Sequence, residues 1–546
     1  MGALLINDNV AAEIGLRLNR SKCKLWGPGA ELHADDDAAF PALVGITRVP
    51  WSSGLKVLGT PVGRAPYVRA QLAEVSDKLA AALDRLQCLG CPQSASLILR
   101  SCLGASKIVH LLRTASLPEA GILASQVRSN LKSAWGTVVG VPFSEAQWTL
   151  GCFPVRLGGA GIVDPVRVHP QAAIASFLSA ASGSTGVELT RLPGDLLDAL
   201  HSLQRTVPGI SEPLLALWSD GDLDAILKAS QLETWIDQKT WTRLVDEAAA
   251  VAFDTNASVR MTRLRKLQSG AHTGAWLTNL PSEKEGVVPF TSFEFQALLR
   301  YRCSIPFTPR GRCGGCSTPL DSFGDHALSC ASCGLYSRHN RLRDALAEEF
   351  IAAGLAIRVE AQLPGDSSRP ADILVLSSSD IIPMAVDVSV VHPLHLSSAS
   401  AEDTPGAAAA ARELGKLATS AQACKDEGWS FSPACAETTG AWGPSGQRCV
   451  RGLIRKLSMK NGEPLADTAA AVWRRLATSV AKGTSQMLLR AYPELFGGPV
   501  RSGSASEAHL SRGLGGSSVE GQTGGLIPQS AGLVFAQPFF PPLSLS

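Results

Sequence analysis

Apolar positions in the first part of the chain recur with a helical spacing. From about residue 66 they fall every three or four residues, which places them on one face of a helix. That face consists of Leu72, Val75, Leu79, Leu83 and Leu86. A second helix is predicted over 94–114, so we expect a helical hairpin. Residues 190–300 are also predicted to be mostly helical, with a break at 281–289.

The pattern changes from about residue 336. A helix over 336–354 precedes three short apolar runs, LAIRVEA, ADILVL and MAVDVSVV, whose β-branched residues favour strands. An alanine-rich helix over 406–427, a strand in WSFSPACAET and two further helices follow. The expected order is therefore α-β-β-β-α-β-α-α. We expect a multidomain chain with a mainly α first half, a small zinc knuckle and an α/β domain like that of restriction endonucleases.

Length and composition add little to this picture. A chain of 546 residues is long enough for several domains. Its net charge of +2 does not by itself indicate a nucleic-acid-binding protein. The first residues lack the basic start and apolar core of a signal peptide, and we find no convincing transmembrane segment. We therefore expect an intracellular protein with reduced cysteines, in which clustered thiols suggest a metal site.

A cluster of cysteines and one histidine has the spacing of a zinc site. The stretch CGGCSTPLDSFGDHALSC contains a Cys-x2-Cys knuckle followed by a His-x3-Cys pair. These are soft ligands at the spacing that tetrahedral Zn²⁺ requires, and no general base is evident, so we expect a structural zinc. The predicted ligands are Cys313, Cys316, His326 and Cys330. Cys333 is a substitute candidate and Cys303 a weaker one, and the alternative is a set of unrelated thiols.

Arginines gather around this cluster. Residues 299–343 contain seven of them, against two acids, Asp321 and Asp325. Arginine pairs well with phosphate, so a basic module beside a catalytic domain would suit DNA binding. The alternative is a solvated arginine face. The residues predicted to bind nucleic acid are Arg310, Arg312, Arg338, Arg341 and Arg343.

Two lone acids stand in neighbouring apolar runs, in RPADILVLSSSDIIPMAVDVSVVHP. Acids are costly to bury, so Asp372 and Asp387 need a reason to be there. Two adjacent strands could point both carboxylates at one cleft and hold Mg²⁺, which would polarise a phosphodiester and activate water. Glu360 could add a third carboxylate, and Lys416 could stabilise charge on the phosphate. The alternative is a pair of acids at strand edges or on the surface. Glu437 is a further acid that could reach the same pocket.

At this point the residues resemble a family. The cysteine knuckle, SRHNRLRD, RPADILVL and AVDVSVVHP are similar to the C-terminal half of non-LTR retrotransposon polyproteins with a restriction-like endonuclease of the PD-(D/E)xK type. The resemblance implies a Mg²⁺-dependent nuclease that nicks target DNA to prime reverse transcription. Asp372 stands for the first motif aspartate, with Ala371 in place of its proline, and Asp387 stands for the second acid.

The lysine of the motif is displaced in this chain. Ser389 occupies the position two residues after Asp387, where the motif has lysine. In these retroelement nucleases the lysine lies on the following helix, and the resemblance assigns that role to Lys416. Ser420 stands where the family has a tyrosine. The alternative function is therefore a catalytically decayed, zinc-containing nucleic-acid-binding remnant of a retrotransposon.

The resemblance extends to the first half of the chain. GLRLNRSKCKLWGPG and LKVLGTPVG look like the end of a reverse-transcriptase palm, whose catalytic aspartates would lie before Met1. We therefore expect no polymerase activity, a double-stranded DNA target, the element RNA as a second candidate partner, and a nuclear location without membrane contact. The implied divisions are 1–65 (palm end), 66–170 (thumb-like helices), 171–299 (helical linker), 300–335 (zinc knuckle), 336–495 (endonuclease) and 496–546 (disordered tail).

Overall fold

The computed structural model describes most of the chain up to residue 496. The described residues are 15, 19–26, 46–183, 194–206, 238–278, 289–307, 311–313, 315–361, 371–376, 382–395 and 403–496. Contacts divide the chain into two units, residues 1–500 and 501–546, and all described residues belong to the first. The finer division of this first unit into separate domains stays a prediction. The predicted disordered tail lies outside the described residues, apart from residue 496.

Short strands precede the first long helix. Strand β1 (Lys24–Leu25), which follows the 3-10 turn η1 (Arg20–Lys22), pairs in parallel with β2 (Thr47–Arg48). Strands β3 (Gly54–Val57) and β4 (Thr60–Gly63) form an antiparallel hairpin. Its two turn residues, Leu58 and Gly59, both have positive φ, at 50° and 88°. That is the backbone twist that closes a two-residue hairpin.

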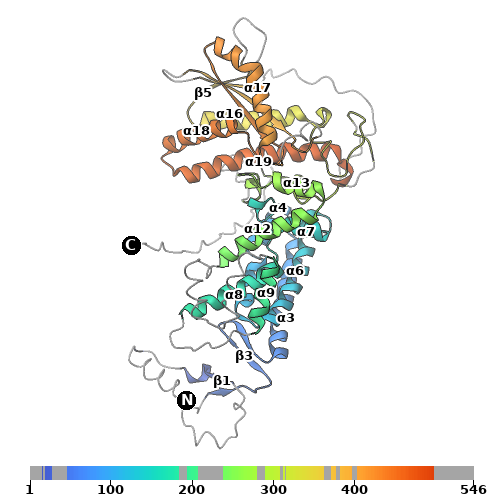
Figure 1. The fold of residues 1–546 in the computed structure, drawn as a ribbon, viewed down its shortest axis with the longest axis vertical. Coiled ribbons are helices and arrows are strands. Elements are labelled where there is room, and N and C mark those ends of the chain that lie inside the picture. Colours follow the sequence, from blue (N-terminus) through green and yellow to red (C-terminus); the bar gives the residue numbers. More distant parts are fainter. Residues whose placement is uncertain are drawn as a thin grey trace, which may run out of the picture. The chain divides into compact units, whose positions relative to one another are not determined.

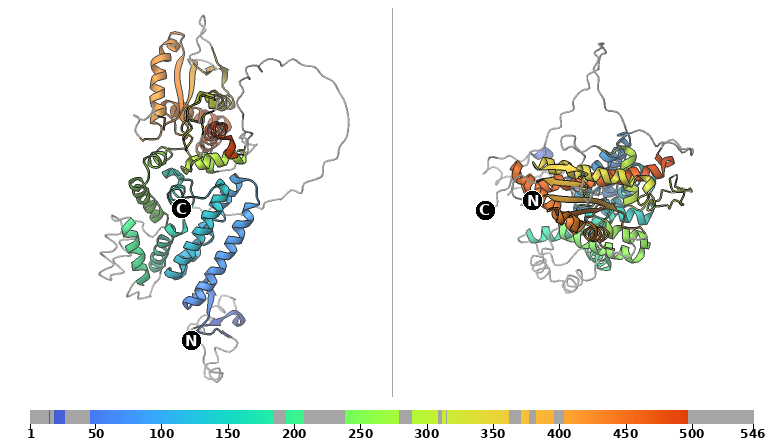
Figure 2. Two further views of the ribbon diagram at one scale, coloured as in Figure 1. Left: turned by 90° about the vertical axis from the view of Figure 1, so that its right-hand side faces the viewer. Right: turned by 90° about the horizontal axis from the view of Figure 1, so that it is seen from above.

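The first helical segments form one apolar core. In α3 (Ala65–Gln87) the predicted leucines 72, 79, 83 and 86 are buried on one face, and Val75 is half-buried. Its main partner is α6 (Leu117–Val139), which runs beside it (Figure 2). The predicted hairpin is thus wrong in its second arm. The stretch after α3 is broken into α4 (Pro92–Ser101), η3 (Ala105–Lys107) and α5 (Val109–Thr114).

The break falls at Gly104. A Cβ there would lie 2.4 Å from the carbonyl oxygen of Leu99, so the backbone folds closely over the end of α4. The apolar period continues through this turn, and it therefore could not reveal the change in chain direction.

Helices also make up most of the described chain between residues 145 and 302. Two buried arginines of the last of these helices tie them to the first core: Arg300 donates to the carbonyl oxygen of Val139, and Arg302 donates to that of Gly159. The segments are α7 (Glu145–Gly151), η4 (Val155–Leu157), α8 (Pro165–Gly183), α9 (Gly194–Thr206), α12 (Gln238–Asn256), α13 (Val259–Leu267), α14 (Ala275–Thr278) and α15 (Ser292–Arg302).

The predicted order of elements after residue 336 is confirmed (Figure 1). The sheet order is β5-β6-β7-β8, antiparallel except for the parallel pair β7–β8, which the crossover helix α17 joins. The elements are α16 (Leu335–Ala352), β5 (Ala356–Val359), β6 (Ile373–Leu376), β7 (Met384–Val391), α17 (Ala407–Asp426), β8 (Ser430–Glu437), α18 (Pro444–Asn461) and α19 (Leu465–Ala491), with η6 (Ala331–Cys333) before them and η8 (Pro493–Phe496) after.

Strand alternation divides this sheet into two faces. Ile373, Val375, Val386 and Val388 pack against α16, α18 and α19. The alternate positions, represented by Leu374, belong to a smaller cluster on the other face, where α17 lies. Since side chains along a strand point to opposite faces in turn, Asp387 shares the α17 face with Ala385, whereas Asp372 lies directly before β6 and bonds to His339 of α16.

Buried glutamates fix the starts of two helices. The Glu413 carboxylate, on α17, accepts hydrogen bonds from the amides of Ser445 (2.9 Å) and Gly446 (2.8 Å) at the start of α18. Glu437, at the end of β8, accepts from the amide of Ala408 (3.1 Å) at the start of α17. The amides of a first helical turn lack partners within the helix, and a carboxylate there also suits the helix dipole.

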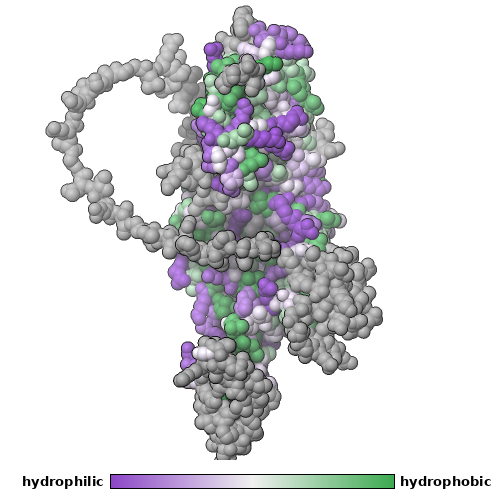
Figure 3. All heavy atoms as spheres, turned by 90° about the vertical axis from the view of Figure 1, so that its left-hand side faces the viewer, coloured by the Kyte–Doolittle hydropathy of each residue, from purple (hydrophilic) through white to green (hydrophobic). Residues whose placement is uncertain are grey.

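One apolar stretch meets the length and composition of a membrane span, Pro92–Thr114, and 44% of its most apolar window is buried within the protein. It is the stretch that folds as α4, η3 and α5 against α6 and α8. Core helices pass the same test, so this is weak evidence for a membrane span. Polar and apolar residues intermingle over the described part of the face in Figure 3.

Candidate metal centres

The four predicted zinc ligands converge. The Sγ atoms of Cys313, Cys316 and Cys330 and a ring nitrogen of His326 all lie within 4.8 Å of one another. The Sγ atoms of Cys313 and Cys330 are 3.8 Å apart. Two thiolates on a tetrahedral zinc, each at about 2.3 Å from the ion, would be about 3.8 Å apart. This cluster could hold a zinc ion.

The loop around the cluster is held by its own hydrogen bonds. The Asp321 carboxylate accepts from the amides of Phe323 (2.7 Å), Asp325 (3.1 Å) and His326 (2.6 Å). The Tyr492 hydroxyl, just beyond α19, donates to the Asp321 carbonyl oxygen. Since these bonds shape the loop that carries His326, the ligand side chains are oriented by the surrounding chain.

Of the two substitute ligands, only Cys333 lies near the cluster. Its Sγ is 3.7 Å from that of Cys313, but it is not one of the four converging atoms. Cys303 is buried in the first helical core. Burial would raise the pKa of the Cys313 thiol, but hydrogen bonds from the backbone at Gly315 and Cys316 and from His326 lower it to about 6. Cys313 is therefore readily converted to the thiolate that binds metal.

The structure corrects part of the predicted arginine surface. Arg338 is buried and donates to the carbonyl oxygens of Leu328 (2.9 Å) and Val390 (3.1 Å), so it joins the zinc loop to β7 and is not open to DNA. An arginine on a helix can be buried where carbonyl oxygens accept from its guanidinium, and here both terminal nitrogens of Arg338 donate while its Nε has no hydrogen-bond partner among the described residues.

The other predicted arginines differ in their surroundings. Arg341 and Arg343 are half-buried; Arg341 donates to the side chain of Gln486, and Arg343 pairs with Asp344 and Glu360. Arg312 is exposed and donates to the carbonyl oxygen of Ser317. Arg310 lies outside the described residues. A continuous arginine face around the zinc cluster therefore does not form from the described members of this set.

The two aspartates stand at the same end of neighbouring strands. The antiparallel register pairs Ile373, the first residue of β6, with Val386 of β7, so Asp372 directly precedes β6 and Asp387 directly follows Val386. The Asp372 amide donates to the carbonyl oxygen of Val386, and its carboxylate accepts from the amide of Val388 (2.7 Å). The two carboxyl groups lie close enough for the charge of Asp372 to raise the pKa of Asp387. Like charges on neighbouring strands destabilise a sheet, so this arrangement calls for compensating positive charge, of which Lys416 beside Asp387 supplies a part.

Their surroundings push the two pKa values apart. Burial would raise the pKa of Asp372, but the hydrogen bond and charge of His339 outweigh it and hold this pKa below its ordinary value. Burial raises the pKa of Asp387 in spite of the opposing charge of Lys416, and the carboxylate of Asp372 raises it further. A pair of this kind is suited to share a proton or to bind a divalent cation.

Lys416 reaches the pair from α17. Its Nζ lies 2.5 Å from Asp387 Oδ1, and both side chains are mostly buried. The residue stands in the third turn of α17, on the helix that crosses over from β7 to β8. The sequence prediction of a lysine delivered from this helix agrees with its placement.

Sequence reasoning missed His339. It lies in the first half of α16, and its Nε2 is 3.1 Å from Asp372 Oδ1. Its only signal was its position inside SRHNRLRD, because a single histidine on a helix does not reveal its tertiary partner.

The additional acids occupy other places. Glu360 is 47% exposed beyond the end of β5, and its carboxylate pairs with Arg343 at 2.5 Å. Its amide donates to the Asp372 carbonyl oxygen, so its backbone adjoins the pair while its side chain is bound to α16. Glu437 is buried at the start of α17, as described above. The described acids that the structure brings together are thus Asp372 and Asp387.

No protein-family model matches the chain, and no curated protein sequence matches it significantly. The chemistry of the two centres is therefore argued from their own geometry.

Proposed function

We propose that this chain is a Mg²⁺-dependent DNA endonuclease of the PD-(D/E)xK type, derived from a non-LTR retrotransposon, and that it nicks double-stranded DNA. The observation that carries the proposal is the arrangement of Asp372, Asp387 and Lys416: one acid directly before β6, one on the neighbouring β7, and an ammonium beside the second acid. Bringing two part-buried acids together is costly, and a bound divalent cation would offset that cost.

The residues fit a divalent cation. Asp372 and Asp387 would supply carboxylate oxygens, the donors that Mg²⁺ prefers. When bound, the ion would polarise the phosphodiester and lower the pKa of a coordinated water. Neither Lys nor His is needed as a ligand, which leaves Lys416 and His339 for other roles.

The protein side chains would then act as follows. The Lys416 ammonium would stabilise the negative charge that grows on the phosphate as water attacks phosphorus and the bond to the 3′ oxygen breaks. His339 would act as a positioning residue, holding Asp372 ionised and oriented. The products are a 3′ hydroxyl and a 5′ phosphate, and the proton lost by the attacking water leaves through solvent.

The zinc cluster would be structural in this proposal. Its four ligands fill a tetrahedral set, so no position remains for substrate. A nuclear location, an element RNA partner and the absence of membrane contact belong to the same proposal and follow from the retroelement resemblance alone.

The test is conversion of supercoiled plasmid to open circles by the zinc-loaded full chain with Mg²⁺. Wild type should nick, and Asp387→Asn should lose about 100-fold or more in rate, because an amide is a poor ligand for Mg²⁺. Asp344→Asn is the matched control, since Asp344 is a mostly exposed acid on α16, and it should nick within about twofold of wild type.

A second candidate function has one observation in its favour. Ser420, one turn after Lys416, occupies the place of the family's tyrosine, and its hydroxyl lies 3.4 Å from that of Thr419. If wild type binds DNA and zinc without nicking, the chain is a catalytically decayed nucleic-acid-binding remnant.

A further inference from the structure

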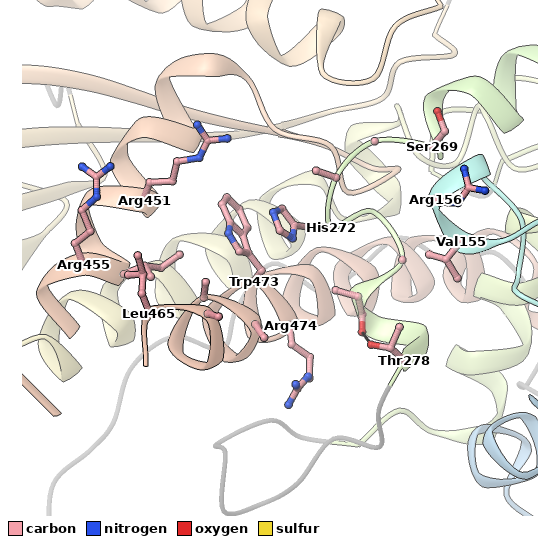
Figure 4. Close-up of a pocket in the computed structure, with 18 residues that line it drawn as sticks. Val155, Arg156, Ser269, His272, Thr278, Arg451, Arg455, Leu465, Trp473 and Arg474 are labelled. Carbon is pink, nitrogen blue, oxygen red and sulfur yellow. Dashed lines mark hydrogen bonds between the residues drawn. The ribbon is translucent and has the colours of Figure 1, made fainter. Parts of the chain in front are cut away.

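A cavity of about 720 Å³ lies away from both metal centres. It is bounded by the turn before α14 and by helices α18 and α19 (Figure 4). Its volume falls within the range of about 300–1,000 Å³ that is usual for ligand sites. A segment from the middle of the chain thus meets the C-terminal helices around an open space.

Glycines let this segment approach closely. A Cβ at Gly270 would lie 2.7 Å from Pro405, and one at Gly274 would lie 2.1 Å from Val155. Between them, His272 has a left-handed backbone with φ of +66°, unusual for a residue other than glycine. Its ring lies flat on Trp473, with ring centroids 4.4 Å apart and planes at 6°. Strain of this kind persists where the surroundings fix a conformation, often at binding sites.

The cavity wall is positively charged. Four arginines line it, Arg156, Arg451, Arg455 and Arg474, and none of its lining residues is acidic. They come from η4, α18 and α19, so the charges surround the space instead of meeting at one point (Figure 4). Helix α18 itself contains five basic residues and no acid.

Two of these arginines are available to a ligand. Arg455 is exposed and has no ion-pair or hydrogen-bond partner among the described residues. Arg451 is exposed and donates a hydrogen bond to the neutral side chain of Gln447. Arg156 is paired with Glu247 at 3.0 Å, so its charge is partly compensated.

The rest of the wall is apolar. Ile454, Leu465, three alanines of α19 and the stacked His272–Trp473 pair lie between the arginines. Partial burial and the charge of Arg451 lower the pKa of His272, which keeps its ring neutral at physiological pH. A ligand that matches this wall carries separated negative charges joined to flat apolar groups. Unpaired nucleotides have this chemistry, because their phosphates suit arginine and their bases suit apolar and ring surfaces.

We propose that this cavity binds a single-stranded segment of the DNA substrate, with Arg451 and Arg455 on its phosphates. The assignment to DNA rests on the proposed nuclease function. A duplex does not fit the cavity, because a double helix presents its bases stacked inside and is wider than this space. An unpaired stretch, such as a strand end that has frayed beside a nick, can enter it.

The test is binding of a fluorescent single-stranded DNA oligonucleotide to the zinc-loaded full chain without Mg²⁺, followed by anisotropy. The double variant Arg451→Ala/Arg455→Ala should weaken binding at least tenfold. It should also reduce the slope of log K against log salt concentration by about 1.4, the value for two phosphate contacts on a single strand. Arg448→Ala is the matched control on the same helix: it is exposed but outside the cavity, and it should bind within twofold of wild type.

A second variant tests the space without changing charge. Ala470 lines the cavity and is exposed on α19, so Ala470→Trp should fill the cavity, leave thermal stability unchanged and weaken single-strand binding at least fivefold. Unchanged binding in both cavity variants overturns the proposal. So does an equal loss with Arg448→Ala, which would assign binding to the whole basic surface of α18.

Two further measurements distinguish single-stranded DNA from other nucleic acids and distinguish cavity binding from nuclease activity. An equal loss of duplex binding, or tighter binding of single-stranded RNA than of DNA, would overturn the assignment to single-stranded DNA. Asp387→Asn should keep full single-strand binding. If the chain binds single strands through this cavity but never nicks DNA, the cavity proposal stands and the nuclease proposal is wrong. If wild type nicks DNA and the cavity variants bind single strands as tightly as wild type, the nuclease proposal stands and the cavity proposal is wrong.

Discussion

Lys416 Nζ lies 2.5 Å from Asp387 Oδ1, across the contact between helix α17 and strand β7. The nuclease motif of the proposed function carries its lysine on the strand, two residues after the second acid, where Ser389 stands in this chain. A lysine side chain on the crossover helix reaches the same carboxylate from above the sheet. The position of an ammonium in space, and not its position in sequence, is what the chemistry requires.

Lys416→Ala should reduce Mg²⁺-dependent nicking by about 100-fold or more, because it removes the cation beside the reacting phosphate. Zinc content and DNA binding should stay near wild type. Lys425→Ala is the matched control, since Lys425 is exposed in the last turn of the same helix. The rate of plasmid nicking measures the effect of each of these two substitutions. Equal rates for Lys416→Ala and wild type would show that this lysine is not used.

His339→Ala should move the acid limb of the nicking profile to higher pH. His339 lowers the pKa of Asp372, so without it burial prevails and this pKa rises. Asp372 must be ionised to bind Mg²⁺, and the variant therefore loses activity at a higher pH than wild type as the pH falls. Rates over about pH 4 to 8, at one subsaturating Mg²⁺ concentration, measure the shift.

His339→Gln keeps a hydrogen-bond donor without a charge and should lie between wild type and the alanine variant. His201→Ala, which changes an exposed histidine of α9, should leave the profile unchanged. A lower rate for His339→Ala at every pH, with the same profile, would argue against the positioning role.

The full chain should bind one Zn²⁺, and Cys330→Ser should lose it, because three ligands hold zinc less tightly than four. Cys333→Ser should retain the metal. Zinc content by atomic emission checks both variants. Zinc should also be released as the pH falls, since protons compete for the thiolates and the imidazole. Full zinc content in Cys330→Ser would exclude it as a ligand.

Arg338→Met should lower the free energy of unfolding by about 3 kcal/mol, because it removes the donor to the buried carbonyl oxygen of Leu328 and to the part-buried one of Val390. Arg312→Ala, at an exposed position, should change it by less than about 0.5 kcal/mol. Urea denaturation followed by tryptophan fluorescence compares the two. A fully stable Arg338→Met protein with weakened DNA binding would restore the expectation that Arg338 contacts DNA.

Features that depend on residues close together in the chain could be predicted from local sequence patterns. The zinc ligands lie within eighteen residues, and their spacing alone was enough to predict the cluster. The element order after residue 336 followed from alternation, helical spacing and the glycine after α16. Lys416 was found because a single helix intervenes between β7 and β8.

Features that depend on distant partners were missed. His339 and Asp372 are separated by 33 residues and meet only through the packing of α16 against the sheet. Arg338 donates to two carbonyl oxygens, which carry no sequence signal. The break at Gly104 and the arginine cavity likewise follow from how backbones approach each other, which periodicity does not report.

The successive capping of α17 by Glu437 and of α18 by Glu413 has a consequence for how this region opens. The start of α17 depends on an acid of β8, and the start of α18 depends on an acid of α17, so none of the three can detach without exposing an uncapped end or an unpaired carboxylate. They should therefore unfold as a single cooperative unit. In native-state hydrogen exchange, the amides of Ala408, Ser445 and Gly446, although at helix starts that usually fray, should exchange as slowly as the central amides of β8.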